Sequence, residues 1–299
     1  LLVFGSVFFA VAILGLPSQA LAQGNAKFAG AESCKACHED ASASYAKSVH
    51  GNKAVPGSSA NRGGCESCHG AAALHVEKSG EKVPGMVSFG NRKVDAKLKD
   101  ASCLSCHEAS KTLAFWKMGK HKSVGCDSCH TVHQSGKKNL KANEPELCYT
   151  CHKDIRSQVN KKSHHPIKEG KVSCTDCHDS HGTFGKKLVK ADTNNELCYK
   201  CHSEKRGPYM FEHLPVEENC LNCHTPHGSN QAKLLTRKTP QLCQSCHDWT
   251  RHPGGHYTAL DTFKSGNQSK QFTARDCMNC HSTIHGSNGP STKGLRFVR

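Results

Sequence analysis

Cys34-Lys35-Ala36-Cys37-His38 is the first of ten stretches in this chain with the pattern Cys-x-x-Cys-His. The stretches begin at residues 34, 65, 103, 126, 148, 174, 198, 220, 243 and 277, and together they use all 20 cysteines of the 299-residue chain. The pattern is typical of c-type heme attachment, in which two thiols form thioethers with the heme and the adjacent histidine binds the iron. We therefore expect ten covalently bound heme c groups.

Two other uses of paired cysteines are less consistent with this pattern. Zinc ribbons also contain Cys-x-x-Cys pairs, and disulfide frameworks also need an even number of cysteines. Neither requires a histidine directly after every second cysteine. The expected thioether residues are Cys34, Cys37, Cys65, Cys68, Cys103, Cys106, Cys126, Cys129, Cys148, Cys151, Cys174, Cys177, Cys198, Cys201, Cys220, Cys223, Cys243, Cys246, Cys277 and Cys280. The expected proximal iron ligands are His38, His69, His107, His130, His152, His178, His202, His224, His247 and His281.

The remaining histidines are numerous enough to bind every iron from the other side. Of 22 histidines, ten belong to the motifs, which leaves His50, His75, His121, His133, His164, His165, His181, His213, His227, His252, His256 and His285. The chain has only four methionines, so methionine cannot serve as the general second ligand. We therefore predict bis-histidine ligation throughout, with two histidines to spare.

Bis-histidine ligation determines what the hemes can do. An iron with two imidazole ligands has no open position for a substrate, so it passes electrons. We therefore predict an electron-transfer protein and not an enzyme. A multiheme enzyme of the nitrite- or hydroxylamine-transforming kind would need an open iron, with a Cys-x-x-Cys-Lys motif or a shortage of distal histidines as its sign. Neither sign is present in the sequence.

Three of the extra histidines recur in the same place. His133, His181 and His227 each follow a proximal histidine by three residues. A histidine so close to its own proximal ligand is better placed to bind a neighbouring heme. We expect such histidines to link hemes into a stack.

The N-terminus has the features of an export signal. Leu1–Leu16 is an apolar run without a charged residue, and Ala20-Leu21-Ala22 resembles a signal-peptidase site. The run is shorter than the roughly 20 residues that a membrane-spanning helix needs. We predict a signal peptide over residues 1–22 and an exported mature domain over 23–299. Export also agrees with the hemes, because c-type heme is attached outside the cytoplasmic membrane.

The spacing of the motifs predicts the fold class. From residue 103 to residue 243 the motifs begin every 22 to 26 residues, an internal repeat that favours a linear array. Hydrophobic residues make up 36% of the chain and aromatic residues 6%, so the hemes themselves must form most of the core. We predict an elongated multiheme cytochrome fold that is mostly irregular, with short helices and little or no sheet. Two five-heme halves that meet near residues 155–170 are the alternative to a single domain.

The formal net charge of +15 has a simple explanation in a heme protein. Ten hemes would bring twenty propionates, a charge of roughly −20, and each oxidised iron centre would add about +1. We therefore interpret the lysines as partners for propionates and as solvated surface. A nucleic-acid partner is not expected.

The residues between the motifs resemble those of a known family. Similar segments are 50–52 (HGN), 196–208 (ELCYKCHSEKRGP), 212–216 (EHLPV), 218–220 (ENC), 226–229 (PHGS), 240–243 (PQLC) and 284–288 (IHGSN). In these segments and in its ten motifs the chain resembles the periplasmic decaheme cytochromes of the MtrA/DmsE type. The resemblance extends over essentially the whole mature chain.

The resemblance implies a conduit of ten hemes inserted into an outer-membrane β-barrel porin. Its partners would be a periplasmic or inner-membrane cytochrome on one side and an outer-face multiheme cytochrome or extracellular reductase on the other. It also implies the distal ligands His50, His75, His121, His133, His165, His181, His213, His227, His252 and His285, with His164 and His256 as the spare histidines. A soluble periplasmic shuttle or a subunit of an extracellular heme filament would share this ligation without a barrel partner.

Overall fold

The computed structural model describes residues 27–91, 93–134, 136–247, 276–279 and 281–298. The predicted signal peptide therefore lies outside the described residues. The chain forms two compact units: the first runs to Val94 and includes Val132–Ser135, and the second comprises Asp95–Thr131 and the chain from Gly136 onward. The domain over 23–299 and its alternative division near 155–170 stay predictions.

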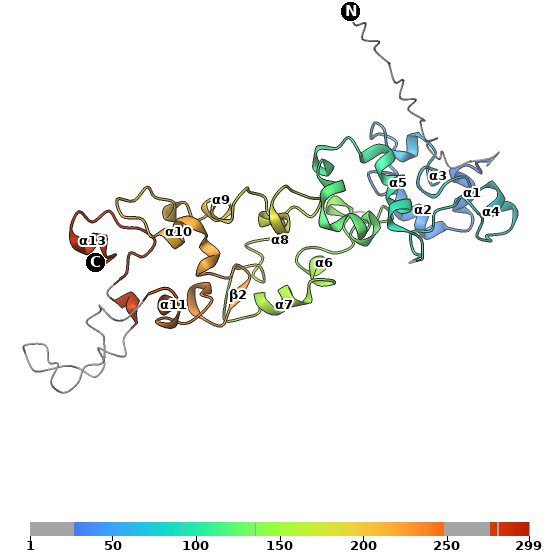
Figure 1. The fold of residues 1–299 in the computed structure, drawn as a ribbon. Helices are drawn as coiled ribbons and strands as arrows, with labels where there is room; N and C mark the ends of the chain where they lie inside the picture. The colour runs from blue at the N-terminus through green and yellow to red at the C-terminus, as the bar shows by residue number, and fades with distance from the viewer. Residues whose placement is uncertain (1–26, 92, 135, 248–275, 280, 299) are drawn as a thin grey trace, which may run out of the picture. The chain divides into compact units, whose positions relative to one another are not determined.

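Helices are short throughout the described residues (Figure 1). The α-helices are α1 (Ala31–Lys35), α2 (Glu39–Ala46), α3 (Glu66–His69), α4 (Ala73–Glu77), α5 (Ala96–His107), α6 (Glu146–Tyr149), α7 (Lys153–Val159), α8 (Cys174–Cys177), α9 (Asn194–Tyr199), α10 (Leu214–Glu218), α11 (Gln241–Gln244) and α13 (Thr292–Leu295). The 3₁₀-helices are η1 (Ser59–Asn61), η2 (Lys111–Leu113), η3 (Trp116–Met118), η4 (Lys120–Ser123), η5 (Cys126–Ser128), η6 (Lys137–Asn139), η7 (Lys186–Leu188), η8 (Ser203–Lys205), η9 (Cys220–Asn222), η10 (Ala232–Leu234) and η11 (Cys277–Asn279).

Sheet is limited to one two-residue pair in the described part of the chain. Strand β1 (Ser163–His164) pairs antiparallel with β2 (Gly228–Ser229), with Ser163 opposite Ser229. The prediction of a mostly irregular fold with short helices and little sheet is confirmed. No helix among the described residues is long and apolar enough to cross a membrane.

Each Cys-x-x-Cys-His motif forms one helical turn. The backbone N–H of the histidine donates to the carbonyl of the first cysteine, as in His38 to Cys34 at 2.9 Å and His130 to Cys126 at 2.9 Å. The third motif lies on the last turns of α5, and the fourth forms η5. One closed turn brings two thiols and an imidazole together, as covalent heme attachment requires.

Three even-numbered motifs are followed by the same loop. An isolated antiparallel bridge joins the histidine to a residue ten or eleven positions later, in the pairs His130–Leu140, His178–Val189 and His224–Leu235. Just before that residue, Lys138, Lys187 and Lys233 have left-handed backbones with φ of 56–59°. A left-handed conformation costs a non-glycine residue about 1–2 kcal/mol. The loop directs the carbonyl of each of these lysines toward the motif histidine, as described below.

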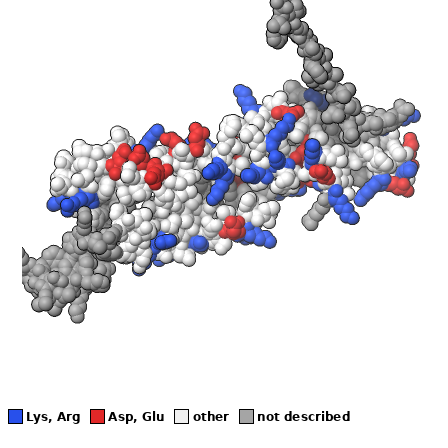
Figure 2. Space-filling model, viewed as in Figure 1, with Lys and Arg blue, Asp and Glu red and all other residues white. Residues whose placement is uncertain are grey.

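Few apolar side chains are buried. Among the described residues the buried hydrophobic ones are Ala72, Val83, Trp116, Tyr149, Val159 and Ile167. In the described part of the chain only one small cluster forms, in which Tyr149, Val159 and Ile167 pack with Ile155 and Val172. The polypeptide alone thus supplies little core. On the face in Figure 2, lysine and arginine side chains are interspersed with carboxylates and do not form one continuous basic surface.

Candidate functional site

Histidine rings approach one another in pairs at a nearly constant distance. Eight pairs are found among the described residues, with ring centroids 6.0–6.3 Å apart. They are His38–His75, His69–His133, His152–His121, His130–His181, His202–His165, His178–His227, His247–His213 and His224–His285. Each pair joins one motif histidine to one of the extra histidines.

The spacing of these rings fits a single iron between two imidazoles. With metal–nitrogen bonds of about 2 Å and about 1.2 Å from each nitrogen to its ring centre, ligands on opposite sides of one metal have centroids about 6.4 Å apart. The interplanar angle varies from 11° in His38–His75 to 72° in His121–His152. Aromatic packing favours particular orientations. A constant distance with a variable angle is instead expected of ligands that rotate about a shared metal–nitrogen axis.

One ring in each of the eight pairs has its Nδ1 atom against a backbone carbonyl. The contacts are His75–Glu81, His69–Val87, His121–Ser180, His130–Lys138, His165–Pro226, His178–Lys187, His213–Ile284 and His224–Lys233, each named as ring and then carbonyl. A carbonyl only accepts, so Nδ1 carries the proton in these rings. The lone pair is then on Nε2, the atom that would bind iron.

Burial favours the uncharged form of several extra histidines. Burial lowers the pKa of His181, His227 and His285 below the usual value for imidazole, and nearby cationic groups add to the effect. The carboxylates of Asp179 and Asp154 partly oppose it at His181 and His227, respectively. A neutral imidazole is the form that binds a metal. The lowered pKa values therefore favour the form that a predicted iron ligand needs at neutral pH.

The histidine that follows a proximal histidine by three residues faces a different motif. His133, His181 and His227 lie opposite His69, His130 and His178, respectively. Each partner belongs to the motif two places earlier in the chain. The segment that follows one attachment turn therefore carries the histidine that faces the motif histidine two places earlier. Such pairs connect alternate motifs.

The thiols of successive motifs also face one another. First cysteines are close neighbours in the pairs Cys34–Cys65, Cys103–Cys126, Cys148–Cys174, Cys198–Cys220 and Cys243–Cys277. Second cysteines are electrostatic neighbours in the pairs Cys129–Cys151, Cys177–Cys201 and Cys223–Cys246. Within the second unit, motifs three to ten are therefore neighbours in the order of the sequence.

Two histidine pairs each contain one predicted ligand and one spare histidine: His164 with His165, and His252 with His256. The structure describes only the first pair. His165 lies opposite His202, whereas both ring nitrogens of the adjacent His164 are engaged, Nδ1 with the Lys161 carbonyl at 2.7 Å and Nε2 with Glu169 at 3.0 Å. His252 and His256 lie outside the described residues, as does Cys280. Nδ1 of His281 contacts the Arg296 carbonyl at 2.7 Å.

His50 and His107 belong to different units. The carbonyl of His50 accepts from the hydroxyls of Tyr45 and Ser59, and His107 ends α5. Their roles, a distal ligand for His50 and a proximal ligand for His107, stay predictions.

Glycine follows His181, His227 and His285, as it follows His50. Close backbone packing explains it at two of these positions. At Gly228 a Cβ atom would overlap the carbonyl oxygen of Gln158 in α7, and at Gly182 it would overlap that of Phe115. These glycines let a neighbouring backbone approach the histidine-bearing loop.

Gly228→Ala is expected to destabilise the holoprotein by about 1–3 kcal/mol, as overpacking typically does. The Gln158 carbonyl belongs to a helix backbone and cannot rotate away, so β2 and His227 must shift. Guanidinium unfolding measures the stability, and absorption spectroscopy measures the low-spin heme fraction. Gly90→Ala is the control, because its Cβ meets no atom within 4 Å. Equal stability of both variants would show that β2 is not tightly packed.

Sequence reasoning missed the polar side chains that join motif pairs. Asp100 lies three residues before Cys103 and accepts a hydrogen bond from the N–H of Cys126, and Asn195 lies three residues before Cys198 and accepts one from the N–H of Cys220, both at 2.7 Å. Glu144, four residues before Cys148, accepts from the N–H of Thr175 at 3.0 Å. The recurrent polar residue before an odd-numbered motif was the available signal.

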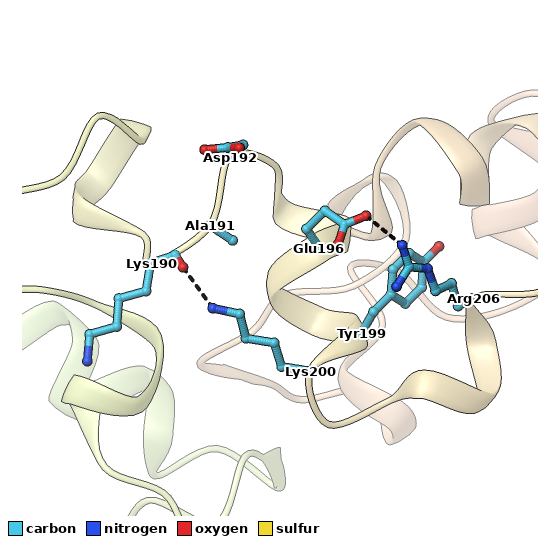
Figure 3. Close-up of a pocket in the computed structure, with 7 residues that line it drawn as sticks. All are labelled: Lys190, Ala191, Asp192, Glu196, Tyr199, Lys200 and Arg206. Atoms are coloured by element: carbon cyan, nitrogen blue, oxygen red, sulfur yellow. Dashed lines mark hydrogen bonds and ion pairs between the residues drawn. The ribbon is translucent and has the colours of Figure 1, made fainter.

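A hollow beside the seventh motif is lined by three basic and two acidic residues (Figure 3). Lys190, Lys200 and Arg206 line it together with Asp192, Glu196, Ala191 and Tyr199. Lys200 donates to the Lys190 carbonyl at 2.8 Å, and Arg206 lies 3.5 Å from Glu196. Cations at an attachment turn would be suitable partners for propionates, and the interpretation of the lysines stays a prediction.

Paired imidazoles beside thiol-bearing turns define a multiheme c-type cytochrome, an electron-transfer protein that binds heme c. A doubled Cys-x-x-Cys-His family pattern matches residues 120–157, 164–207 and 213–252. The chain belongs to the MtrA family. It is 39% identical over 284 residues to the multiheme cytochrome MtrA of Shewanella baltica strain OS185, a match that covers 92% of this chain and 84% of that protein.

More distant relatives are also multiheme cytochromes. The high-molecular-weight cytochrome c of Nitratidesulfovibrio vulgaris strain Hildenborough is 26% identical over 59% of this chain. The C-type polyheme cytochrome OmcB of Geobacter sulfurreducens is 24% identical over 78% of this chain. Each match covers only 31% of the relative's length, so this chain resembles part of those larger proteins.

Proposed function

We propose that the mature chain carries ten heme c groups with bis-histidine ligation and conducts electrons across the outer membrane. The eight imidazole pairs carry this proposal, because an iron held from both sides has no position for a substrate. His107 and His281 would complete the ten proximal ligands. His50 and His252 would complete the distal set.

The closeness of thiols in successive motifs supports a continuous path. Thioethers lie at the heme edge, so motifs whose thiols are neighbours would hold hemes near one another. From the third to the tenth motif, thiols of successive motifs are neighbours without a gap. An electron would then pass from each heme to the next one along the chain.

Insertion into an outer-membrane β-barrel porin is the proposed route through the membrane. Irregular backbone leaves polar groups that lipid cannot satisfy, so a chain of this kind needs a protein sheath. Membership of the MtrA family supports the same arrangement. The proposed partners are a periplasmic or inner-membrane cytochrome at one end and an outer-face multiheme cytochrome or extracellular reductase at the other.

Copurification followed by reconstitution tests the proposed function. The protein extracted from its native membrane in detergent is expected to copurify with a barrel protein and to contain ten hemes by intact mass. Proteoliposomes that hold the complex should pass electrons from an external reductant to an enclosed oxidant, and liposomes that hold the barrel alone should not. A heme-loaded protein that purifies alone from the soluble fraction would instead indicate a shuttle or a filament subunit.

A further inference from the structure

The side chains that join motif pairs differ in charge from one pair to another. In the third and fourth motifs the joining residue is the carboxylate of Asp100, on α5. In the seventh and eighth motifs it is the amide of Asn195, on α9. The two residues hold equivalent positions, three residues before the first cysteine of the odd-numbered motif.

Asp100 is a buried carboxylate between two attachment turns. Asp100 is only 3% exposed, and its Oδ1 accepts a hydrogen bond from the N–H of Cys126 at 2.7 Å. It is also an electrostatic neighbour of the Cys103 and Cys126 thiols. Its charge would therefore lie beside both hemes of this pair.

Asn195 performs the same joining role without a charge. It is 7% exposed, and Oδ1 accepts from the N–H of Cys220 at 2.7 Å. Its Nδ2 also donates to the carbonyls of Val216 and Glu217, each at 2.8 Å. An amide is thus sufficient to hold two motifs together, and the hydrogen bond alone does not explain a carboxylate at position 100.

Asp100 lies in a small charged group with Lys99 and Asp127. Lys99 is buried as well, and its ammonium lies 3.0 Å from a second carboxylate, that of Asp127. Two carboxylates and one ammonium leave a net charge of −1 in this group. Burying such a charge is unfavourable, so its presence calls for a role other than packing.

The charge of an iron centre depends on its oxidation state. With two neutral imidazoles and the porphyrin dianion, the ferric centre carries +1 and the ferrous centre is neutral. A buried negative charge therefore stabilises the ferric state, and it acts strongly where water is excluded. Local charge and burial are among the means by which a protein adjusts the potential of its heme.

We propose that Asp100 sets the reduction potentials of the hemes attached at the third and fourth motifs. Its carboxylate lowers these potentials by favouring the loss of an electron from each iron. This role rests on the proposed heme attachment and bis-histidine ligation. It makes the third and fourth hemes poorer electron acceptors than an amide at position 100 would allow.

Asp100→Asn in the holoprotein tests this role. The asparagine keeps the Oδ1 acceptor for Cys126 and removes the charge. A spectroelectrochemical titration is expected to show the component from two of the ten hemes shifted upward, by about tenfold in the reduction equilibrium constant, which equals about 59 mV for one electron. The control is Asp95→Asn, which removes the same charge from the exposed N-cap of α5 and keeps a good capping residue.

The outcomes distinguish this inference from the proposed function. A fully loaded, low-spin Asp100→Asn protein with unchanged potentials overturns the role of Asp100 alone, as does an equal shift in Asp95→Asn. Too few hemes or high-spin iron in the unaltered protein would overturn the proposed ligation. If Asp100→Asn fails to load heme, Glu144→Gln is the second test, because Glu144 is the joining carboxylate of the fifth and sixth motifs. Glu144 has a carboxylate oxygen within 4.8 Å of the Cys148 and Cys174 sulfurs, and the inference requires the same upward shift there.

Discussion

His165→Ala is expected to convert one heme, roughly a tenth of the total, from low-spin to high-spin iron. The ring of His165 lies 6.3 Å from that of His202, and its Nδ1 contacts the Pro226 carbonyl, so Nε2 is the atom free to bind iron. An alanine leaves that iron with one imidazole and an open position. Electron paramagnetic resonance of the ferric protein and carbon monoxide titration of the ferrous protein would measure the change.

His164→Ala is the matched control for this prediction. His164 is the preceding residue, yet its ring bonds to Lys161 and Glu169 and leaves no nitrogen for iron. We expect this variant to stay fully low-spin and to bind no more carbon monoxide than the unaltered protein. If His164→Ala opened an iron while His165→Ala did not, the proposed ligand of the seventh heme would be wrong.

The chain without heme is expected to be unfolded. Burying one large apolar side chain stabilises a protein by about 1.5–3 kcal/mol, whereas ordering the backbone of one residue costs about 1–2 kcal/mol. Only six hydrophobic residues are buried among the described residues. Their burial would offset the entropy cost of ordering only about ten residues. The hemes must therefore provide most of the stabilisation.

Expression in a host that lacks the heme-attachment machinery tests this expectation. Circular dichroism should show little helix, and the amide hydrogens should exchange at nearly the rates of an unstructured peptide. The same chain matured with heme is the control and should show protected amides in the helices near the attachment turns. Native-like protection in the heme-free chain would mean that the polypeptide forms its own core.

Much of the candidate site could be predicted from local sequence. A Cys-x-x-Cys-His motif closes a single helical turn, as the hydrogen bond from His130 to Cys126 illustrates, so five consecutive residues contain the whole attachment geometry. The short helices also follow from local features, because glycine, proline and lysine between the motifs prevent long apolar periodicity. Mostly irregular structure was therefore predictable without knowledge of any long-range contact.

The pairing of the histidines could not be predicted in the same way. His181 is three residues from His178 in sequence, but it lies opposite His130, and His285 lies opposite His224. Such pairs depend on loops that bring distant segments together. The joining residues Asp100 and Asn195 were missed for the same reason, since their partners are 26 and 25 residues away.

The sequence by itself indicated the chemistry of this protein: paired thiols with an adjacent histidine are typical of covalent heme attachment, and the further histidines are numerous enough to serve as second iron ligands. It could do so because attachment is a property of one turn of chain. Only the tertiary structure decided which histidines face each other, which motifs are neighbours, and where a buried charge lies beside the attachment turns. These features depend on contacts between residues far apart in the chain, which spacing along the sequence does not specify.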